Sequence, residues 1–144
     1  MSKKKTAAKT VAQPELEGRR IMVVDDEDDA RTFLSTVLAD AGAAIIEASD
    51  GDQAIDLAKK EIPDLITLDI SMPGKDGVEV FRQLRGGSDT ASIPICVVTG
   101  HPEFREVIYT VPAAKPDGYM HKPVDPEDLV NGLRRIFELK DKKQ

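Results

Sequence analysis

The sequence predicts an α/β fold, a doubly wound five-stranded parallel sheet with helices on both faces. From Arg20 onward, short apolar runs alternate with amphipathic segments in five successive units. The apolar runs are continuous, which is typical of strands that are covered on both faces. No long linker interrupts this order, and strict alternation of strands and helices favours a parallel sheet with right-handed crossovers.

Each of the first two units combines a predicted strand with a predicted helix. Residues 21–24 form a buried strand that ends in acid. Residues 28–41 carry apolar side chains at helical spacing after an acidic start, and Gly42 is a plausible helix stop. Residues 43–48 are expected to form the second strand and residues 52–60 the second helix, whose apolar face is short.

The third unit begins with a strand at residues 65–68. Turn-forming residues at 72–77 then lead into a third helix that starts near Val78 and ends at Gly86-Gly87. Residues 93–98 are expected to form the fourth strand.

The last two units are less regular. Residues 103–110 predict a weaker helix, which prolines nearby should keep short or distorted. A short fifth strand is expected at residues 118–120. The final helix starts well, with Asp125 as N-cap and Pro126 at the first helical position, and its apolar face extends to Phe137.

Charge divides the chain into two parts. Of 144 residues with a net charge of −6, residues 1–20 carry six basic and two acidic groups, so the remainder carries −10. We expect residues 1–18 to be a disordered basic tail, residues 19–140 the domain and residues 141–144 a short tail. An acidic body argues against a nucleic-acid partner and suits a cation or a protein partner.

Two further features bear on location. The single cysteine, Cys96, cannot form an internal disulfide, which fits a reducing compartment. No apolar stretch is long enough to cross a membrane, and no apolar region follows the basic start as it would in a signal peptide. We therefore expect a cytoplasmic protein without a membrane partner.

The candidate chemistry lies where the predicted strands end, because open parallel sheets bind ligands beyond the carboxyl ends of their strands. Asp25 and Asp26 follow the first strand, Asp69 the third and Thr99 the fourth, and Lys122 precedes the last helix. If strands 1 and 3 flank the switch point, three carboxylates come close together.

Three neighbouring carboxylates need a compensating cation, and oxygen ligands suit Mg²⁺. The lysine would add a positive charge and the threonine a hydroxyl donor. A carboxylate that faces a phosphate beside a metal ion can act as a nucleophile and form an aspartyl-phosphate. The sequence contains no glycine-rich nucleotide-binding motif.

Four segments carry a family resemblance over residues 19–140. They read Val-Val-Asp-Asp-Glu at 23–27, Pro-Asp-Leu-Ile-Thr-Leu-Asp-Ile-Ser-Met-Pro-Gly-Lys-Asp-Gly at 63–77, Val-Val-Thr-Gly at 97–100 and Gly-Tyr-Met-His-Lys-Pro at 118–123. In this order and spacing the chain resembles response-regulator receiver domains, in particular single-domain chemotaxis regulators. The resemblance implies a flavodoxin-like strand order, 2-1-3-4-5.

The resemblance also implies a role for each matching residue. Asp69 corresponds to the phosphoacceptor and Lys122 to the lysine that pairs with the phosphoryl group. The Mg²⁺ ligands would be the acidic pair, Asp69 and a backbone carbonyl, supplied here by Asp25, Asp26, Asp69 and Ser71. Thr99 corresponds to the switch hydroxyl and Tyr119 to the aromatic residue whose rotamer follows it. Gly100 replaces a frequent alanine, and His101 follows it.

Simpler roles compete at several positions. Asp69 could cap a turn, either residue of the pair Asp25-Asp26 could cap the first helix, and Lys122 could be solvated. Tyr119 could be a packing residue only. As a hypothesis, His101 alters loss of the phosphoryl group through the attacking water; a His101→Ala variant with an unchanged dephosphorylation rate would exclude this.

The sequence therefore predicts a phosphoacceptor switch of a two-component system rather than an enzyme with turnover. Its partners would be a sensor histidine kinase or phosphotransfer protein and a downstream protein target. One alternative is a phosphatase with Asp69 as nucleophile, although Ser71 stands where such enzymes place a general acid. The other is a docking scaffold that is never phosphorylated, which the intact acidic set argues against.

Overall fold

The structure is a computed structural model that describes residues 14–70, 77–101, 105–109 and 115–142. It confirms the predicted fold, a five-stranded sheet in the order β2-β1-β3-β4-β5 with parallel pairing throughout. The strands are β1 (Arg20–Val24), β2 (Ala44–Ala48), β3 (Leu65–Leu68), β4 (Ile95–Thr99) and β5 (Gly118–His121). The helices are α2 (Asp28–Asp40), α3 (Gly51–Glu61), α4 (Gly77–Gly86), α5 (Arg105–Tyr109) and α6 (Pro126–Lys142).

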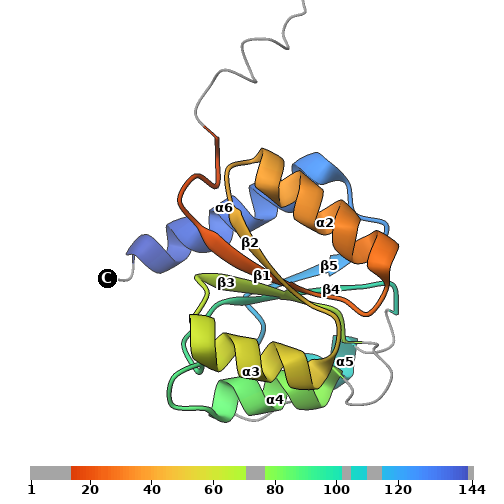
Figure 1. The fold of residues 1–144 in the computed structure, drawn as a ribbon, viewed down its shortest axis with the longest axis vertical. Helices are drawn as coiled ribbons and strands as arrows, with labels where there is room; N and C mark the ends of the chain where they lie inside the picture. Colours follow the sequence, from red (N-terminus) through yellow and green to blue (C-terminus); the bar gives the residue numbers. More distant parts are fainter. Residues whose placement is uncertain (1–13, 71–76, 102–104, 110–114, 143–144) are drawn as a thin grey trace, which may run out of the picture.

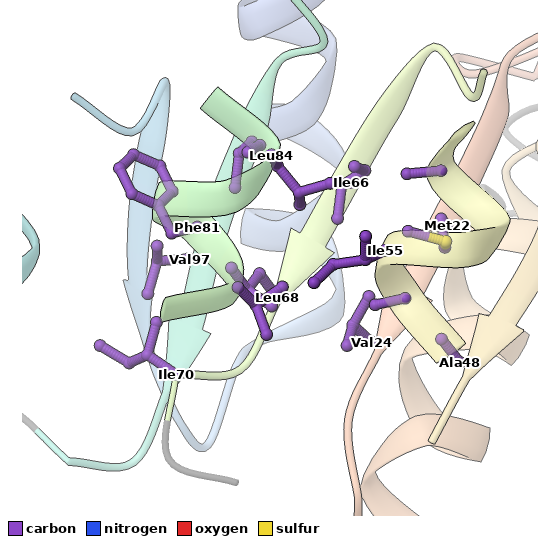
Figure 2. Close-up of a cluster of buried hydrophobic side chains, with 14 of the residues drawn as sticks. Met22, Val24, Ala48, Ile55, Ile66, Leu68, Ile70, Phe81, Leu84 and Val97 are labelled. Carbon is purple, nitrogen blue, oxygen red and sulfur yellow. The ribbon is translucent and has the colours of Figure 1, made fainter. Parts of the chain in front are cut away.

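Helices cover both faces of the sheet, as Figure 1 shows, with α2 and α6 on one face and α3 and α4 on the other. Each strand therefore sends alternate side chains into two separate apolar layers. The layer under α3 and α4 includes Val24, Leu68 and Phe81, which belong to the buried cluster drawn in Figure 2. The layer under α2 and α6 is built from aliphatic residues with Phe137 and Cys96.

The register of the central strands sets the position of the candidate site. Val24 of β1 lies level with Leu68 of β3, so the two strands end side by side. The backbone N–H of Asp69 donates to the carbonyl of Val24 at 3.1 Å, which extends the pairing by one residue. Asp25 and Asp69 consequently leave the sheet next to each other.

Helix ends follow the local signals of the sequence. The Asp50 carboxylate accepts a hydrogen bond from the backbone N–H of Gln53 at 2.8 Å and caps α3. The Asp125 carboxylate does the same for α6 through Asp128 at 3.1 Å, as predicted. Gly42, the predicted stop of α2, has a φ of +102° that L side chains rarely adopt.

Both predicted tails are shorter than the sequence suggested. Residues 15–18 form a turn in which Leu16 is completely buried and donates its N–H to the carbonyl of Ala41 at 2.8 Å. A disordered tail over residues 1–18 is therefore wrong for residues 14–18, while residues 1–13 lie outside the described residues. At the other end, α6 continues to Lys142, two residues into the predicted tail.

Element boundaries differ from prediction by a few residues. The fourth strand begins at Ile95 rather than residue 93, because Pro94 has no N–H to donate to the ladder. The N–H of Ala43 bonds the carbonyl of Leu38, which delays the start of β2. Among the described helices, none combines the length and apolar character that a membrane span requires.

Candidate functional site

Three carboxylates meet where β1 and β3 end. Asp25 is completely buried, Asp69 is 6% exposed and Asp26 is half-buried. One oxygen of each lies within 4.8 Å of an oxygen of the other two. The strands deliver these acids as predicted, because equal register brings the residues after Val24 and Leu68 to the same edge of the sheet.

Lys122 reaches this group from the segment after the edge strand β5. It follows β5, and its backbone N–H donates to the carbonyl of Thr99 at 2.9 Å, which fixes where its side chain starts. The ammonium Nζ lies 2.6 Å from Oδ2 of Asp25 and 3.3 Å from Oδ2 of Asp69. The lysine is thus paired with carboxylates that the sheet brings from two other strands.

The charges around Lys122 change its proton affinity. Burial alone lowers the pKa of the lysine, but the hydrogen bond to Asp25 and the negative charge of Asp69 outweigh burial. The pKa of Lys122 is therefore raised above its ordinary value, so the side chain is held as an ammonium ion. The simpler interpretation, a solvated lysine, does not fit a side chain that makes two ion pairs.

Asp25 is held firmly by its own surroundings. Its N–H donates to the carbonyl of Ala48 at 3.1 Å, and its carboxylate oxygen Oδ1 accepts the N–H of Glu27 at 3.0 Å. Glu27 is the N-cap residue of α2 and makes no side-chain cap itself. Asp25 therefore orders the turn into α2 with one oxygen and contacts Lys122 with the other.

The residues present fit a divalent cation. Asp25, Asp26, Asp69 and Lys122 together carry a formal charge of −2, which one divalent ion would neutralise. The donors that these three acids offer are carboxylate oxygens, the ligand type that hard cations such as Mg²⁺ prefer. A cavity of about 210 Å³ opens beside them and is lined by Asp26, Glu27, Asp69, Gly100, His101 and Lys122.

His101 lines the same cavity, and Thr99 lies two residues before it at the end of β4. Thr99, at the end of β4, is completely buried, and its hydroxyl oxygen accepts the backbone N–H of His101 at 3.1 Å. This bond bends the chain so that Gly100 and His101 face the cavity beside Asp69. His101 is exposed. The structure thus places His101 at the cavity that Asp69 lines, with Thr99 buried two residues earlier in the chain.

Tyr119 lies in β5, outside the lining of this cavity. It is half-buried, and its ring meets the ring of His121 edge-on at 5.4 Å and the ring of Tyr109 at 6.2 Å. The guanidinium of Arg105 stands 5.5 Å from the Tyr119 ring centre. Tyr119 is therefore packed between β5 and α5 and does not line the cavity.

Ser71, expected to offer its carbonyl to the metal, lies outside the described residues. Gly77 has a part in the site that the sequence analysis missed: a Cβ atom there would come 2.1 Å from Cα of Ile70 and 2.7 Å from the carbonyl oxygen of Asp69. The sequence carried a signal for this close contact, because Gly77 is the last glycine of the turn segment between the third strand and the third helix.

A second, apolar groove of about 520 Å³ adjoins the cavity. It runs between the first turns of α2 and the segment after β5, and Lys122 lines both hollows. Phe33 in this groove is 42% exposed. The groove is lined by Asp29, Ala30, Phe33, Leu34, Lys122, Pro123 and Val124.

Comparison with known sequences agrees with this geometry. The family described as response regulator receiver domain matches residues 21–134. The alkaline phosphatase synthesis transcriptional regulatory protein PhoP of Bacillus subtilis is 40% identical over 120 residues, 83% of this chain and 48% of PhoP. Protein PilH of Pseudomonas aeruginosa is 32% identical over 118 residues, 82% of this chain and 97% of PilH. The chain thus spans about half of PhoP and nearly all of PilH.

Solved structures give the same result. The chemotaxis response regulator CheY4 of Vibrio cholerae superposes with a TM-score of 0.74 at 32% identity, covering 82% of this chain and 98% of CheY4. A CheY-like receiver domain protein from Methanospirillum hungatei, at 22% identity and a TM-score of 0.79, shares the fold. Because the family match covers most of the chain and PilH is aligned over nearly its full length, the chain belongs to the receiver domains of two-component response regulators.

Proposed function

We propose that this chain is a signalling switch that accepts a phosphoryl group on Asp69 from a phosphohistidine donor. The observation that carries the proposal is the meeting of Asp69 with Asp25, Asp26 and Lys122 at one open cavity. A nearly buried carboxylate among like charges, with a lysine at 3.3 Å, is a combination that structural stability alone does not require.

The proposed reaction transfers a phosphoryl group from an imidazole nitrogen of the donor to a carboxylate oxygen of Asp69. An oxygen of Asp69 attacks phosphorus, the bond from phosphorus to the donor imidazole nitrogen breaks, and that nitrogen keeps the electron pair. Lys122 offsets negative charge on the phosphoryl oxygens, for which its ammonium form is required. A bound Mg²⁺ would supply further charge neutralisation and alignment. Asp25 and Asp26, with Asp69, would hold this ion.

The product is an aspartyl-phosphate, which water later hydrolyses to restore the carboxylate. The chain would promote its own phosphorylation and its own dephosphorylation without turning over other substrates. Thr99 would donate its hydroxyl to the phosphoryl group, and Tyr119 would respond through the packing of β5 and α5. The signal would pass to a downstream protein in the cytoplasm by contact with the changed surface.

The test is the intact mass of the protein after incubation with acetyl phosphate and Mg²⁺. One phosphoryl adduct is expected on the wild-type chain and none on Asp69→Asn or without the metal ion. An adduct of equal yield on Asp69→Asn would overturn the assignment of the acceptor. Steady release of phosphate from a phosphomonoester would favour the phosphatase alternative instead.

The apolar groove supports a protein donor. It shares Lys122 with the cavity, so a protein that presents phosphohistidine to Asp69 would also cover Phe33. Phe33→Ser should therefore slow transfer from a phosphorylated histidine phosphotransfer protein and leave the reaction with acetyl phosphate unchanged. Equal slowing with both donors would show that Phe33 acts through the fold rather than through docking.

A further inference from the structure

Arg31, in the second turn of α2, makes contacts that the phosphoacceptor site does not directly explain. Its side chain is only 15% exposed and donates three hydrogen bonds in different directions. Nε bonds Glu47 of β2 at 3.0 Å, Nη2 bonds Asp28 at 2.6 Å and Nη1 bonds the backbone carbonyl of Asp25 at 2.9 Å. One guanidinium thus connects β2, the start of α2 and the turn after β1.

The bond to the Asp25 carbonyl matters most for the site. That carbonyl belongs to the peptide unit that joins Asp25 to Asp26, and a peptide unit is planar. Holding its oxygen therefore fixes the direction in which the chain enters Asp26. The other end of Asp25 is already fixed, because its N–H bonds Ala48 at 3.1 Å.

The two carboxyl partners of Arg31 orient the guanidinium. Glu47 and Asp28 each take one edge of the planar group, so the third edge can point only at the Asp25 carbonyl. The pKa of Arg31 is raised, first by its hydrogen bond to Asp28, which outweighs the lowering by burial, and further by Glu47. Lysine, with a compact ammonium, could not make all three bonds with this geometry.

We propose that Arg31 is a positioning residue that holds the Asp25–Asp26 peptide so that both carboxylates can share one cation. The inference rests on the proposed function, because it concerns the same cation site. As a positioning residue, Arg31 contacts neither the ion nor the phosphoryl group. It acts through the backbone, as residues outside the ligand shell commonly do at metal sites.

The change in cation affinity distinguishes a loss of positioning from a change in charge, because Coulomb's law fixes the sign of the charge effect. Removing a positive group near three carboxylates, and leaving Asp28 and Glu47 without their partner, should tighten binding of a cation if charge alone mattered. Loss of positioning should weaken binding instead. The two explanations therefore predict changes of opposite sign for the same substitution.

The experiment is calorimetric titration of the full chain with Mg²⁺, repeated with Mn²⁺ by electron paramagnetic resonance. Arg31→Met should weaken the affinity for either ion about tenfold, the lower end of what outer-shell changes cost. Arg31→Lys, which keeps the charge, should lie between Met and wild type. The matched control is Arg82→Met in α4, whose arginine pairs with Glu79 on the surface and should leave the affinity unchanged.

Equal or tighter binding by Arg31→Met would overturn the proposal. If that variant does not fold by circular dichroism, Arg31→Lys decides, and an affinity equal to wild type would overturn it. At saturating Mg²⁺ the rate of phosphorylation by acetyl phosphate should return to within about twofold of wild type, whereas at low Mg²⁺ it should fall in proportion to occupancy. A wild-type chain that binds neither ion would contradict the proposed function itself.

Discussion

Lys122 is the residue on which the charge balance of the site depends. Its ammonium is the cation at 2.6 Å from Asp25, whose side chain has no exposed surface, and it is also within 3.3 Å of Asp69. A buried carboxylate without a counter-charge is costly, since the protein replaces only part of the hydration that is lost. Lys122 therefore stabilises the fold in addition to its proposed part in phosphoryl transfer.

Lys122→Met should lower the free energy of unfolding by about 2 kcal/mol without metal, less than the ~3–5 kcal/mol of a fully buried pair because the cavity opens to solvent. Mg²⁺ should recover part of this loss, since binding to the folded state alone stabilises it. Urea unfolding followed by circular dichroism measures both values, because the chain has no Trp. Lys59→Met, on the exposed surface of α3, is the control and should change stability by less than ~0.5 kcal/mol.

At this scale the sequence predicted which residues meet but not how they are held. Asp25, Asp69 and Lys122 could be identified because strand ends and charge are visible in the sequence. Arg31 could not, because its three bonds reach β2 and a backbone carbonyl, and such partners depend on the register between strands. Ser71 stays a prediction.

Among the elements, α4 begins directly beside the site. Its first residue, Gly77, lies directly against the backbone of Asp69 and Ile70, and its N–H donates to the carbonyl of Ile70 at 3.2 Å. A side chain at this point would have to displace backbone atoms rather than a flexible side chain. The packing of α4 against Asp69 and Ile70 thus leaves no room for a side chain at Gly77.

Gly77→Ala should destabilise the fold by about 3 kcal/mol, the upper end of what overpacking commonly costs, because the chain after β3 must move. It should also slow phosphorylation by acetyl phosphate at a temperature where the variant is still folded. Gly86→Ala is the matched control at the other end of α4, where an added Cβ meets nothing within 4 Å. That variant should keep the wild-type rate and gain up to ~1 kcal/mol of stability.

The segment before β1 is a second element whose importance the sequence concealed. Basic and polar composition suggested a tail, yet Leu16 is buried against the apolar layer under α2 and α6. Glu15 pairs with Arg134 at 2.8 Å, and the guanidinium of Arg19 lies 4.2 Å from the centre of the Phe137 ring. A single apolar residue in a polar context gives no periodic signal, so it could not be found from pattern alone.

Leu16→Ala should lower the free energy of unfolding by about 2–4 kcal/mol, because it removes a fully buried side chain and leaves a cavity. The yield of the phosphoryl adduct should not change, since Leu16 precedes β1 and the site lies beyond the other end of that strand. Leu139→Ala, at a leucine that is 56% exposed on α6, should change stability by less than ~0.5 kcal/mol. A loss below ~1 kcal/mol for Leu16→Ala would show that this segment is not part of the core.

For the molecule as a whole, the fold was predictable because its signals repeat. Five apolar runs, each followed by an amphipathic segment, left few alternatives to a parallel sheet, and the helix cap at Asp125 was readable locally. Strand β4 and the two tails were less well predicted, since Pro94 removes a donor from the ladder and Leu16 acts through a tertiary contact. The order of the strands came from family resemblance rather than from periodicity.

Cys96 offers a probe of global opening, because it is the only cysteine of the chain and lies fully buried in β4. Burial, with a smaller effect of the Asp117 charge, raises the pKa of its thiol to about 12. At pH 8 we expect no reaction with a disulfide reagent in the folded state, and one equivalent after unfolding in urea. Reaction of the folded protein within seconds would contradict this burial.

The same thiol predicts a pH dependence. In the unfolded chain the Cys96 thiol ionises near its ordinary pKa of ~8.5, whereas in the folded chain it keeps its proton to about 12. The unfolded state therefore binds fewer protons between these values, and stability should fall as pH rises above ~8.5. Comparison with Cys96→Ala, which should lack this component, isolates it from the titration of other groups.

The salt bridge of 3.0 Å between Arg19 and Asp141 joins residues 122 positions apart in the sequence. Arg19 immediately precedes β1, while Asp25 immediately follows it, so the bridge and the cavity lie at opposite ends of that strand. A fluorescent reporter or an added domain attached before Leu16 or after Lys142 would start on the side away from Asp69. Such fusions should leave the phosphoryl donor an open approach, which makes either end a practical point of attachment for following signalling in living cells.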